Sequence, residues 1–111
     1  MPLHANNSRR AELDLAFQYR WYAKQAGVEI AERYLAAFDA EIHRLCEQPG
    51  IGRARYFRIP ELAGMRSKSL PHPFDVHLIF YRTEGNLLSI ERVLHGARDL
   101  PRRLLEAPAE Q

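Results

Sequence analysis

The sequence predicts an α+β fold in which an N-terminal antiparallel helical hairpin packs on a small, mainly antiparallel β-sheet. Hydrophobic residues recur at helical spacing over residues 9–26 and again over 28–48, with only Gly27 between the two segments. Residues 76–95 then hold two runs rich in Val, Ile, Leu, Phe and Tyr that flank a glycine-containing turn, a pattern typical of a β-hairpin. A sheet with an apolar face has to be covered, and the helical hairpin is the available cover. We therefore expect a two-layer sandwich.

The first helix is predicted over residues 9–26. Asn7 or Ser8 has a side chain suited to the N-cap, and Gly27 is suited to ending the helix. Two apolar stripes run along it, one formed by Leu13, Phe17 and Trp21 and the other by Leu15, Tyr19 and Tyr22. Either the second helix and the sheet cover one stripe each, or one stripe stays exposed as a patch that another protein covers.

The second helix is predicted over residues 28–48. Its apolar residues recur at alternating steps of four and three: Ala31, Leu35, Phe38, Ile42 and Leu45. Pro49 and Gly50 are expected to end it. The short connection at Gly27 favours an antiparallel pair of helices that bury their apolar stripes against each other.

The segment after the helices is predicted to be a basic loop. Residues 50–65 contain several glycines together with Arg53, Arg55 and Arg58, and they show no sustained hydrophobic period. A short strand at residues 56–59 is the one regular element expected within this loop.

Three strands are expected to follow, over residues 65–70, 75–82 and 87–95. Pro71 ends the first of them because proline cannot donate a hydrogen bond to a ladder. Alternation gives the second strand two largely apolar faces, one with His77, Ile79 and Tyr81 and the other with Val76, Leu78 and Phe80. The C-terminal tail is expected to form one helical turn.

The length and composition indicate a single domain over residues 1–111, with a core over about 8–100 and a tail over 101–111. No apolar run approaches the roughly 18 to 20 residues that span a bilayer, and the N-terminus lacks the apolar segment of a secretory signal. A cytoplasmic protein is expected. Cys46 is the only cysteine and the five histidines show no metal-binding spacing, so we expect no metal and no cofactor. Cys46 should be a small, partly buried apolar residue.

Positive charge is concentrated in the second half of the chain. Residues 1–50 carry six Lys and Arg against seven Asp and Glu, a net charge of −1, whereas residues 51–103 carry ten against five, a net charge of +5. Nine of those ten cations are arginines, whose planar fork suits phosphate and carboxylate groups. An anionic partner is therefore expected.

The candidate contacts for such a target are the cations of the predicted sheet: Arg66, Lys68, Arg82, Arg92 and Arg98. The hypothesis requires them to gather on one exposed face of the sheet, opposite the helices. In the competing interpretation each is a solvated residue or pairs with a nearby acid, and such exposed pairs contribute only roughly 0 to 1 kcal/mol each. For Arg98 the neighbouring Asp99 makes a structural pair the favoured interpretation.

Three motifs follow one another along the chain: EQPGIGR at residues 47–53, IFYR at 79–82 and ERVLHGARDL at 91–100. In this order they resemble the ParE branch of the ParE/RelE toxin superfamily of bacterial toxin–antitoxin systems, and the match runs from about Ser8 to Leu100. The resemblance implies one more strand around residues 2–6, which gives the element order β-α-α-β-β-β.

The resemblance also implies a function. A ParE-like toxin belongs to a type II toxin–antitoxin system of the kind that stabilises plasmids, it inhibits DNA gyrase without being an enzyme, and a ParD-like antitoxin holds it inactive in a hetero-oligomer. On this basis the antitoxin contacts are expected at Trp21, Tyr22, Arg53 and Arg55, and the gyrase contacts at the cations of the sheet.

The alternative within the same superfamily is a RelE-like endoribonuclease that cuts mRNA on the ribosome. There the cations would hold the scissile phosphate while another group transfers a proton, and the weak candidates for that group are His95, Tyr81 and Glu61. RelE-type nucleases tend to place an aromatic residue or histidine close to the C-terminus, and residues 99–111 contain neither. The sequence therefore favours gyrase inhibition. A degenerate toxin that only binds its antitoxin is the third interpretation.

Overall fold

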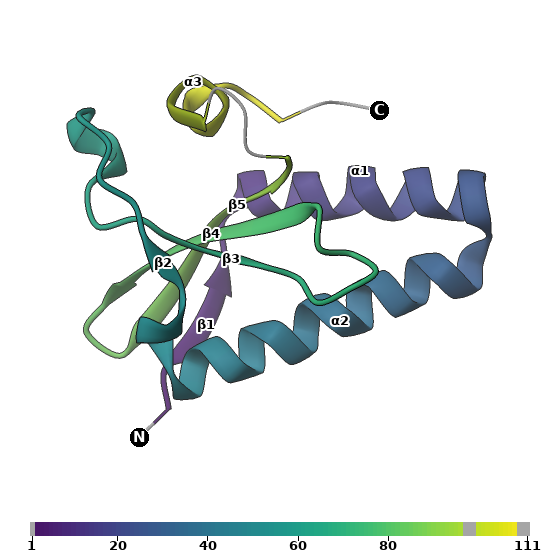
Figure 1. Cartoon of the computed structure of the whole chain (residues 1–111), viewed down its shortest axis with the longest axis horizontal. Helices are drawn as coiled ribbons and strands as arrows, with labels where there is room; N and C mark the ends of the chain where they lie inside the picture. Colours follow the sequence, from purple (N-terminus) through teal and green to yellow (C-terminus); the bar gives the residue numbers. More distant parts are fainter. Residues whose placement is uncertain (1, 97–99, 109–111) are drawn as a thin grey trace.

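The computed structural model describes residues 2–96 and 100–108. The first strand, β1 (His4–Asn7), is followed by two long helices, α1 (Arg9–Ala26) and α2 (Val28–Glu47). The remaining elements are two 3-10 turns, four strands and a short helix: η1 (Pro49–Ile51), β2 (Arg53–Ala54), η2 (Pro60–Leu62), β3 (Arg66–Ser69), β4 (His77–Glu84), β5 (Leu87–His95) and α3 (Leu100–Leu105). The predicted α+β class, with a helical hairpin packed on a mainly antiparallel sheet, is confirmed (Figure 1).

The helical hairpin forms where the hydrophobic pattern predicted it. Ser8 is the N-cap of α1, because its Oγ accepts a hydrogen bond from the N–H of Ala11 at 3.0 Å. Gly27 separates the helices with a φ of +99°, which glycine adopts without the steric cost that other residues meet. From this connection the two helices diverge towards the sheet (Figure 1).

The sheet has five strands in the order β1-β5-β4-β3-β2. β1 is parallel to β5, and all other neighbours are antiparallel. β4 and β5 form the central hairpin, in which Glu84 pairs with Leu87 and Gly85 has a φ of +60° in the turn between them. The N-terminal strand implied by the family resemblance is present and occupies His4–Asn7.

The first hydrophobic core lies between the helical hairpin and the sheet. Its largest side chains come from α2, β4 and β5 and from the segment before β4: Tyr34, Phe38, Leu45, Phe74, Ile79, Tyr81, Leu88, Ile90 and Val93. Full burial of one such side chain stabilises the fold by roughly 1.5–3 kcal/mol. The predicted face of β4 with Ile79 and Tyr81 is therefore the face turned to the helices, and Cys46 packs against it partly buried, as predicted.

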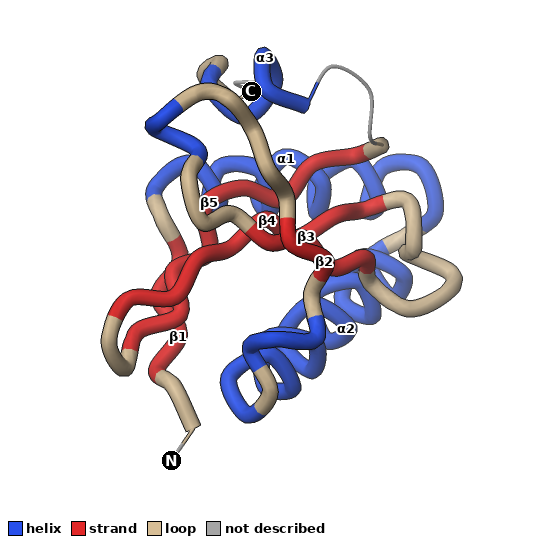
Figure 2. Tube along the Cα trace, turned by 60° about the vertical axis from the view of Figure 1, so that its left-hand side comes forward, coloured by secondary structure: helices blue, strands red, loops and turns tan. Residues whose placement is uncertain are grey.

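A second core covers the opposite face of the sheet, for which the sequence had indicated no cover. Phe80 and Leu94 are buried there by side chains from the segment around η2 and from α3: Leu62, Met65, Leu100 and Leu104. Figure 2 shows α3 on the other side of the strands from α2. The expectation that the helical hairpin alone covers the sheet was therefore incomplete, because both faces of β4 are apolar and both are covered.

The prediction of a strand at residues 56–59 is wrong. Extended pairing occurs earlier, at Arg53–Ala54, which forms β2 against β3. One further backbone hydrogen bond joins the N–H of Arg55 to the carbonyl of Met65 at 2.9 Å. Beyond this bond Phe57 and Ile59 pack against the second core, so their side chains contribute to the cover of the sheet instead of continuing its ladder.

Gly52 lies against the ring of Tyr81 where the chain leaves η1. The Tyr81 hydroxyl donates a hydrogen bond to the carbonyl of Pro49 at 2.7 Å and accepts one from the N–H of Gly52 at 3.0 Å. A Cβ atom added at Gly52 would overlap this hydroxyl, whereas one added at Gly50 would meet no atom within 4 Å. The glycine is therefore required for close approach, since its φ of −72° is open to any residue.

We predict that Gly52→Ala lowers the free energy of unfolding by about 1–3 kcal/mol, because the added methyl group forces the Tyr81 hydroxyl away from both of its partners. Urea denaturation followed by circular dichroism measures the loss. Gly50→Ala is the matched control and should change stability by less than about 0.5 kcal/mol. Equal stability of the two variants would contradict this account of Gly52.

Candidate partner-binding surface

Helix α1 completes the hydrogen bonding of β5 along the edge that β1 does not reach. β1 pairs with the first half of β5, up to Ile90. Further along, the N–H of Val93 donates to Oδ2 of Asp14 at 3.0 Å, and the Val93 carbonyl accepts from Nε2 of Gln18 at 2.8 Å. Side chains of α1 therefore replace a neighbouring strand, which satisfies backbone groups that would otherwise be unpaired.

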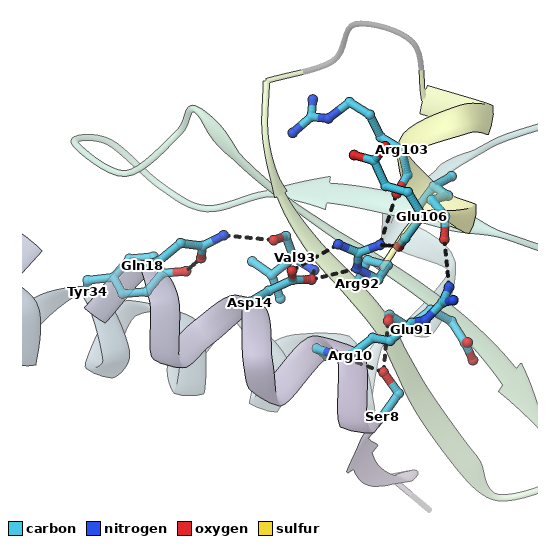
Figure 3. A network of polar contacts seen from close by, with 12 residues as sticks. Ser8, Arg10, Asp14, Gln18, Tyr34, Glu91, Arg92, Val93, Arg103 and Glu106 are labelled. Atoms are coloured by element: carbon cyan, nitrogen blue, oxygen red, sulfur yellow. Dashed lines mark hydrogen bonds and ion pairs between the residues drawn. The ribbon is translucent and has the colours of Figure 1, made fainter. Parts of the chain in front are cut away.

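Arg92 forms a buried ion pair with Asp14 at the same place. Its Nε and Nη2 donate to the two carboxylate oxygens at 2.8 and 3.0 Å, and the two residues are only 4% and 7% exposed. Its Nη1 donates to the carbonyls of Arg103 and Glu106 at 2.9 and 2.8 Å, at the end of α3 (Figure 3). A cation suits this position because the last carbonyls of a helix have no partner within the helix. One guanidinium thus joins β5, α1 and the C-terminal segment.

A groove of about 420 Å³ opens beside this ion pair, between α1, the end of β5 and the end of α3. Aromatic side chains of α1 line one side of it: Phe17, Trp21 and Tyr22. Residues of β5 and the C-terminal segment line the other side, among them Leu94, His95, Arg103 and Ala107. Trp21 is 52% exposed, which is unusual for so large an apolar ring, and it contacts Tyr22 edge to face at 5.2 Å.

Polar groups beneath the groove bind one another. The hydroxyl of Tyr22 lies 2.8 Å from Nε2 of His77, which is only 2% exposed. Burial lowers the pKa of His77 to about 4, and the nearby His95 adds to this shift, so the imidazole is neutral at neutral pH. Tyr34 donates a hydrogen bond to Oε1 of Gln18, and burial raises the pKa of this tyrosine. The contact with His77 and the packing of its ring against Tyr34 fix the position of Tyr22 at the base of the groove.

Of the predicted target-binding cations, Arg66 and Lys68 lie on the helix side of the sheet. Arg66 is the register partner of Tyr81, and its Nη1 donates to the carbonyl of Gly52 at 2.9 Å. Lys68 has its Nζ 3.8 Å from a carboxylate oxygen of Glu41, a buried acid of α2. Both side chains therefore bind groups next to the helical hairpin.

Arg82 and Arg92 lie on the other face. Arg82 donates to the carbonyls of Glu61 and Ala63 at 2.9 and 3.1 Å, beside η2. Arg92 is buried in its ion pair, so its guanidinium is not presented to a partner in this structure. Arg98, and with it the expected pair with Asp99, lies outside the described residues. The expectation of a single cationic face is therefore wrong for the described members of the group.

A β-bulge accounts for the position of Arg92. Tyr81 pairs with Ile90 and Phe80 pairs with Arg92, which leaves Glu91 as an extra residue on β5. Regular alternation would put Arg92 on the same face as Ile90, the face turned to the helices. The extra residue turns Arg92 to the face of Phe80 instead.

The three proton-transfer candidates lie in separate parts of the molecule. His95 is exposed at the end of β5, Glu61 is exposed in η2, and Tyr81 is fully buried on the helix side of β4. The Tyr81 hydroxyl is committed to the backbone of Pro49 and Gly52. The described structure therefore does not bring these three groups together.

The residues expected to bind an antitoxin fall into two groups. Trp21 and Tyr22 both line the groove. Arg53 and Arg55 lie in and next to β2, at the opposite side of the sheet, and Nε of Arg55 donates to Oγ of Ser67 at 2.8 Å.

Sequence reasoning missed Asp14 and Gln18, which hold the groove and the ion pair together. A signal for them exists in the sequence. Asp14 stands between Leu13 and Leu15 in an apolar stretch, and Asp14, Gln18 and Tyr22 follow at steps of four, which puts them on one face of the helix. A polar row on a helix that has apolar stripes on its other sides indicates buried polar partners.

The described residues offer neither a metal cluster nor a membrane helix. Over residues 2–96 and 100–108, no three or more His, Cys, Asp or Glu residues are arranged to hold a metal ion. None of the helices described is both long and apolar enough to cross a bilayer.

Comparison with known proteins gives matches to a family model and to solved structures. The family model described as ParE toxin of type II toxin-antitoxin system, parDE, matches residues 7–100. A solved structure, the chromosomal ParDE TA system from P. aeruginosa, is similar with a TM-score of 0.69 and 21% sequence identity, over 86% of this chain and 97% of that chain. At this identity the likeness shows a shared fold. A search among curated proteins found no match.

We predict that Asp14→Asn destabilises the protein by about 3–5 kcal/mol, because it leaves the guanidinium of Arg92 buried without a counter-charge. Chemical denaturation measures the change. Asp39→Asn removes the same charge from an exposed position of α2 and should have an effect within about 0.5 kcal/mol. If Asp14→Asn cost no more than this control, the ion pair would not hold the fold together.

Proposed function

Because the chain belongs to the ParE toxin family of type II toxin–antitoxin systems, we propose that it inhibits DNA gyrase in the bacterial cytoplasm and that a ParD-like antitoxin neutralises it. The match covers residues 7–100 and includes all three motifs that resemble ParE. This membership is the observation that carries the proposal. Inhibition of this kind needs a binding surface and no catalytic base.

The separation of the proton-transfer candidates supports inhibition by binding over the alternative of RNA cleavage. A general base has to lie within hydrogen-bond reach of the proton that it removes, with the phosphate held beside it. His95 and Glu61 belong to different elements, and the hydroxyl of Tyr81 is buried in bonds to the backbone. The half-buried cations of the sheet are the proposed contacts for the target, with Arg66 and Lys68 on its helix side and Arg82 on the other face.

Of the four residues expected to contact the antitoxin, Trp21 and Tyr22 line the groove beside α1 while Arg53 and Arg55 do not, and the groove is the proposed site of the antitoxin. It presents an exposed Trp21 next to Phe17 and Tyr22, and aromatic rings in a concave surface are the usual anchors of protein interfaces. Arg103 and His95 stand at the same groove and can meet carboxylates of an acidic partner. The occupant we propose is an amphipathic, acidic helix from the C-terminal half of the antitoxin, with its apolar side on the aromatic rings.

We expect the purified protein to stop supercoiling by gyrase and to accumulate cleaved DNA when it is incubated with gyrase, DNA and ATP. Agarose gel electrophoresis after removal of protein measures both products. In a parallel reaction with programmed ribosomes, the mRNA should stay intact. Ribosome-dependent mRNA cleavage with unaffected gyrase would establish the alternative, and activity in neither reaction would indicate a toxin that only binds its antitoxin.

We expect Trp21→Ala to weaken binding of the antitoxin encoded beside this gene by at least about tenfold, because the ring is the largest exposed anchor of the groove. Isothermal titration calorimetry measures the affinity. Val28→Ala is the control, since Val28 is 61% exposed and does not line the groove. Equal affinity of both variants would place the antitoxin elsewhere, while leaving the gyrase result unaffected.

A further inference from the structure

The segment that follows β2 presents a tyrosine among arginines at the edge of the sheet. Tyr56 is 92% exposed, the highest value among the large apolar and aromatic residues described. Arg55 precedes it, Arg58 follows two positions later, and Arg53 lies in β2 itself. Arg53 and Arg58 are exposed and Arg55 is half-buried. An aromatic ring that buries almost none of its surface contributes little to the fold, and beside cations it offers a ligand a face for stacking.

Contacts on both sides of Tyr56 hold this segment in place. Before it, the N–H of Arg55 donates to the carbonyl of Met65 at 2.9 Å, and Nε of Arg55 donates to Oγ of Ser67 at 2.8 Å. After it, Phe57 and Ile59 pack against the second core. The backbone is therefore tied to the sheet around the tyrosine, which reduces the entropy lost when a partner binds the ring.

The three arginines concentrate positive charge within six positions of the sequence. None of the ion pairs found within residues 2–96 and 100–108 includes Arg53, Arg55 or Arg58. Burial lowers the pKa of Arg55, and the like charge of Arg53 lowers it further, so the two positive charges disfavour each other. A bound anion would relieve this repulsion.

We propose that this surface, formed by Arg53, Arg55, Tyr56 and Arg58, binds a single strand of nucleic acid. The guanidinium forks bind backbone phosphates, and one base stacks on the exposed ring of Tyr56. A single strand fits better than a duplex, because only an unpaired base can offer its face to a side chain at the protein surface. DNA and RNA share this chemistry. The carboxylates of an acidic protein segment would pair with the arginines, but they would not stack on the ring of Tyr56.

This surface is separate from the groove proposed for the antitoxin. The groove lies at β5 and α1, while β2 forms the other side of the sheet, with β4 and β3 between them. The inference goes beyond gyrase inhibition and does not depend on it, since it concerns a direct contact between this chain and a nucleic acid. Gyrase is absent from the experiment that tests it.

Fluorescence anisotropy with short labelled oligonucleotides tests the inference. The probes are single-stranded DNA, single-stranded RNA of the same sequence and the DNA duplex, each titrated with the full chain at several salt concentrations. We expect Arg53→Gln/Arg58→Gln to weaken single-strand binding about tenfold or more and to lower the salt slope by roughly 1 to 2. Arg33→Gln, on the exposed face of α2, is the control for lost charge and should bind almost as the unmodified chain does.

Substitutions of Tyr56 distinguish base stacking from a general attraction of the arginines to phosphate. Tyr56→Ala should weaken single-strand binding about fivefold or more, and Tyr56→Phe should retain it because the stacking face is kept. If the single-stranded DNA and the single-stranded RNA differ in affinity, the tighter one is the nucleic acid that this surface recognises. Equal binding of duplex and single strands with no effect of Tyr56→Ala would overturn the inference, as would binding of a labelled poly-glutamate peptide without binding of any oligonucleotide.

Discussion

The buried ion pair between Arg92 and Asp14 is the interaction on which the arrangement of the domain depends. Removing both charges from water is costly, and the cost is offset only when nearly every hydrogen-bonding position has a partner. Here Nε, Nη1 and Nη2 of the guanidinium all donate, and the carboxylate also accepts from the backbone of Val93. The geometry can be satisfied only when β5, α1 and the end of α3 are in place together. The pair therefore couples three segments that are distant in the sequence.

That coupling explains why a domain of this size can cover both faces of its sheet. The helical hairpin packs on one face, and α3 with the segment around η2 packs on the other. α3 is only six residues long and could not be stable alone. Its two buried leucines and the bonds from Arg92 to the carbonyls of Arg103 and Glu106 hold it on the second core. The groove exists because α1 and this C-terminal segment are both fixed against β5.

Features that depend on local chemistry could be read from the sequence, whereas features that depend on register could not. The cap at Ser8, the break at Gly27 and the faces of β4 follow from side-chain type and periodicity. The position of Arg92 follows from a bulge at Glu91, which no periodicity indicates and which reverses the face of every later residue on β5. The predicted cationic face failed because Arg66 and Arg82 lie on opposite faces of the sheet and because Arg92 is buried in its ion pair with Asp14. The burial of Asp14 was not predicted because an acid inside a helix is ordinarily solvated.

The two surfaces of the molecule differ in the chemistry that they can recognise. The groove combines a partly exposed indole with apolar walls, which suits the apolar side of a protein helix. The segment after β2 carries one almost fully exposed phenol ring. Its guanidinium groups have no acidic partners among the described residues. Because two strands separate them, a short helix in the groove would leave Arg53, Arg55 and Arg58 uncovered. The proposed neutralisation by a partner in the groove and the proposed contact with a nucleic acid are therefore separable by mutation, since the two surfaces have no residue in common.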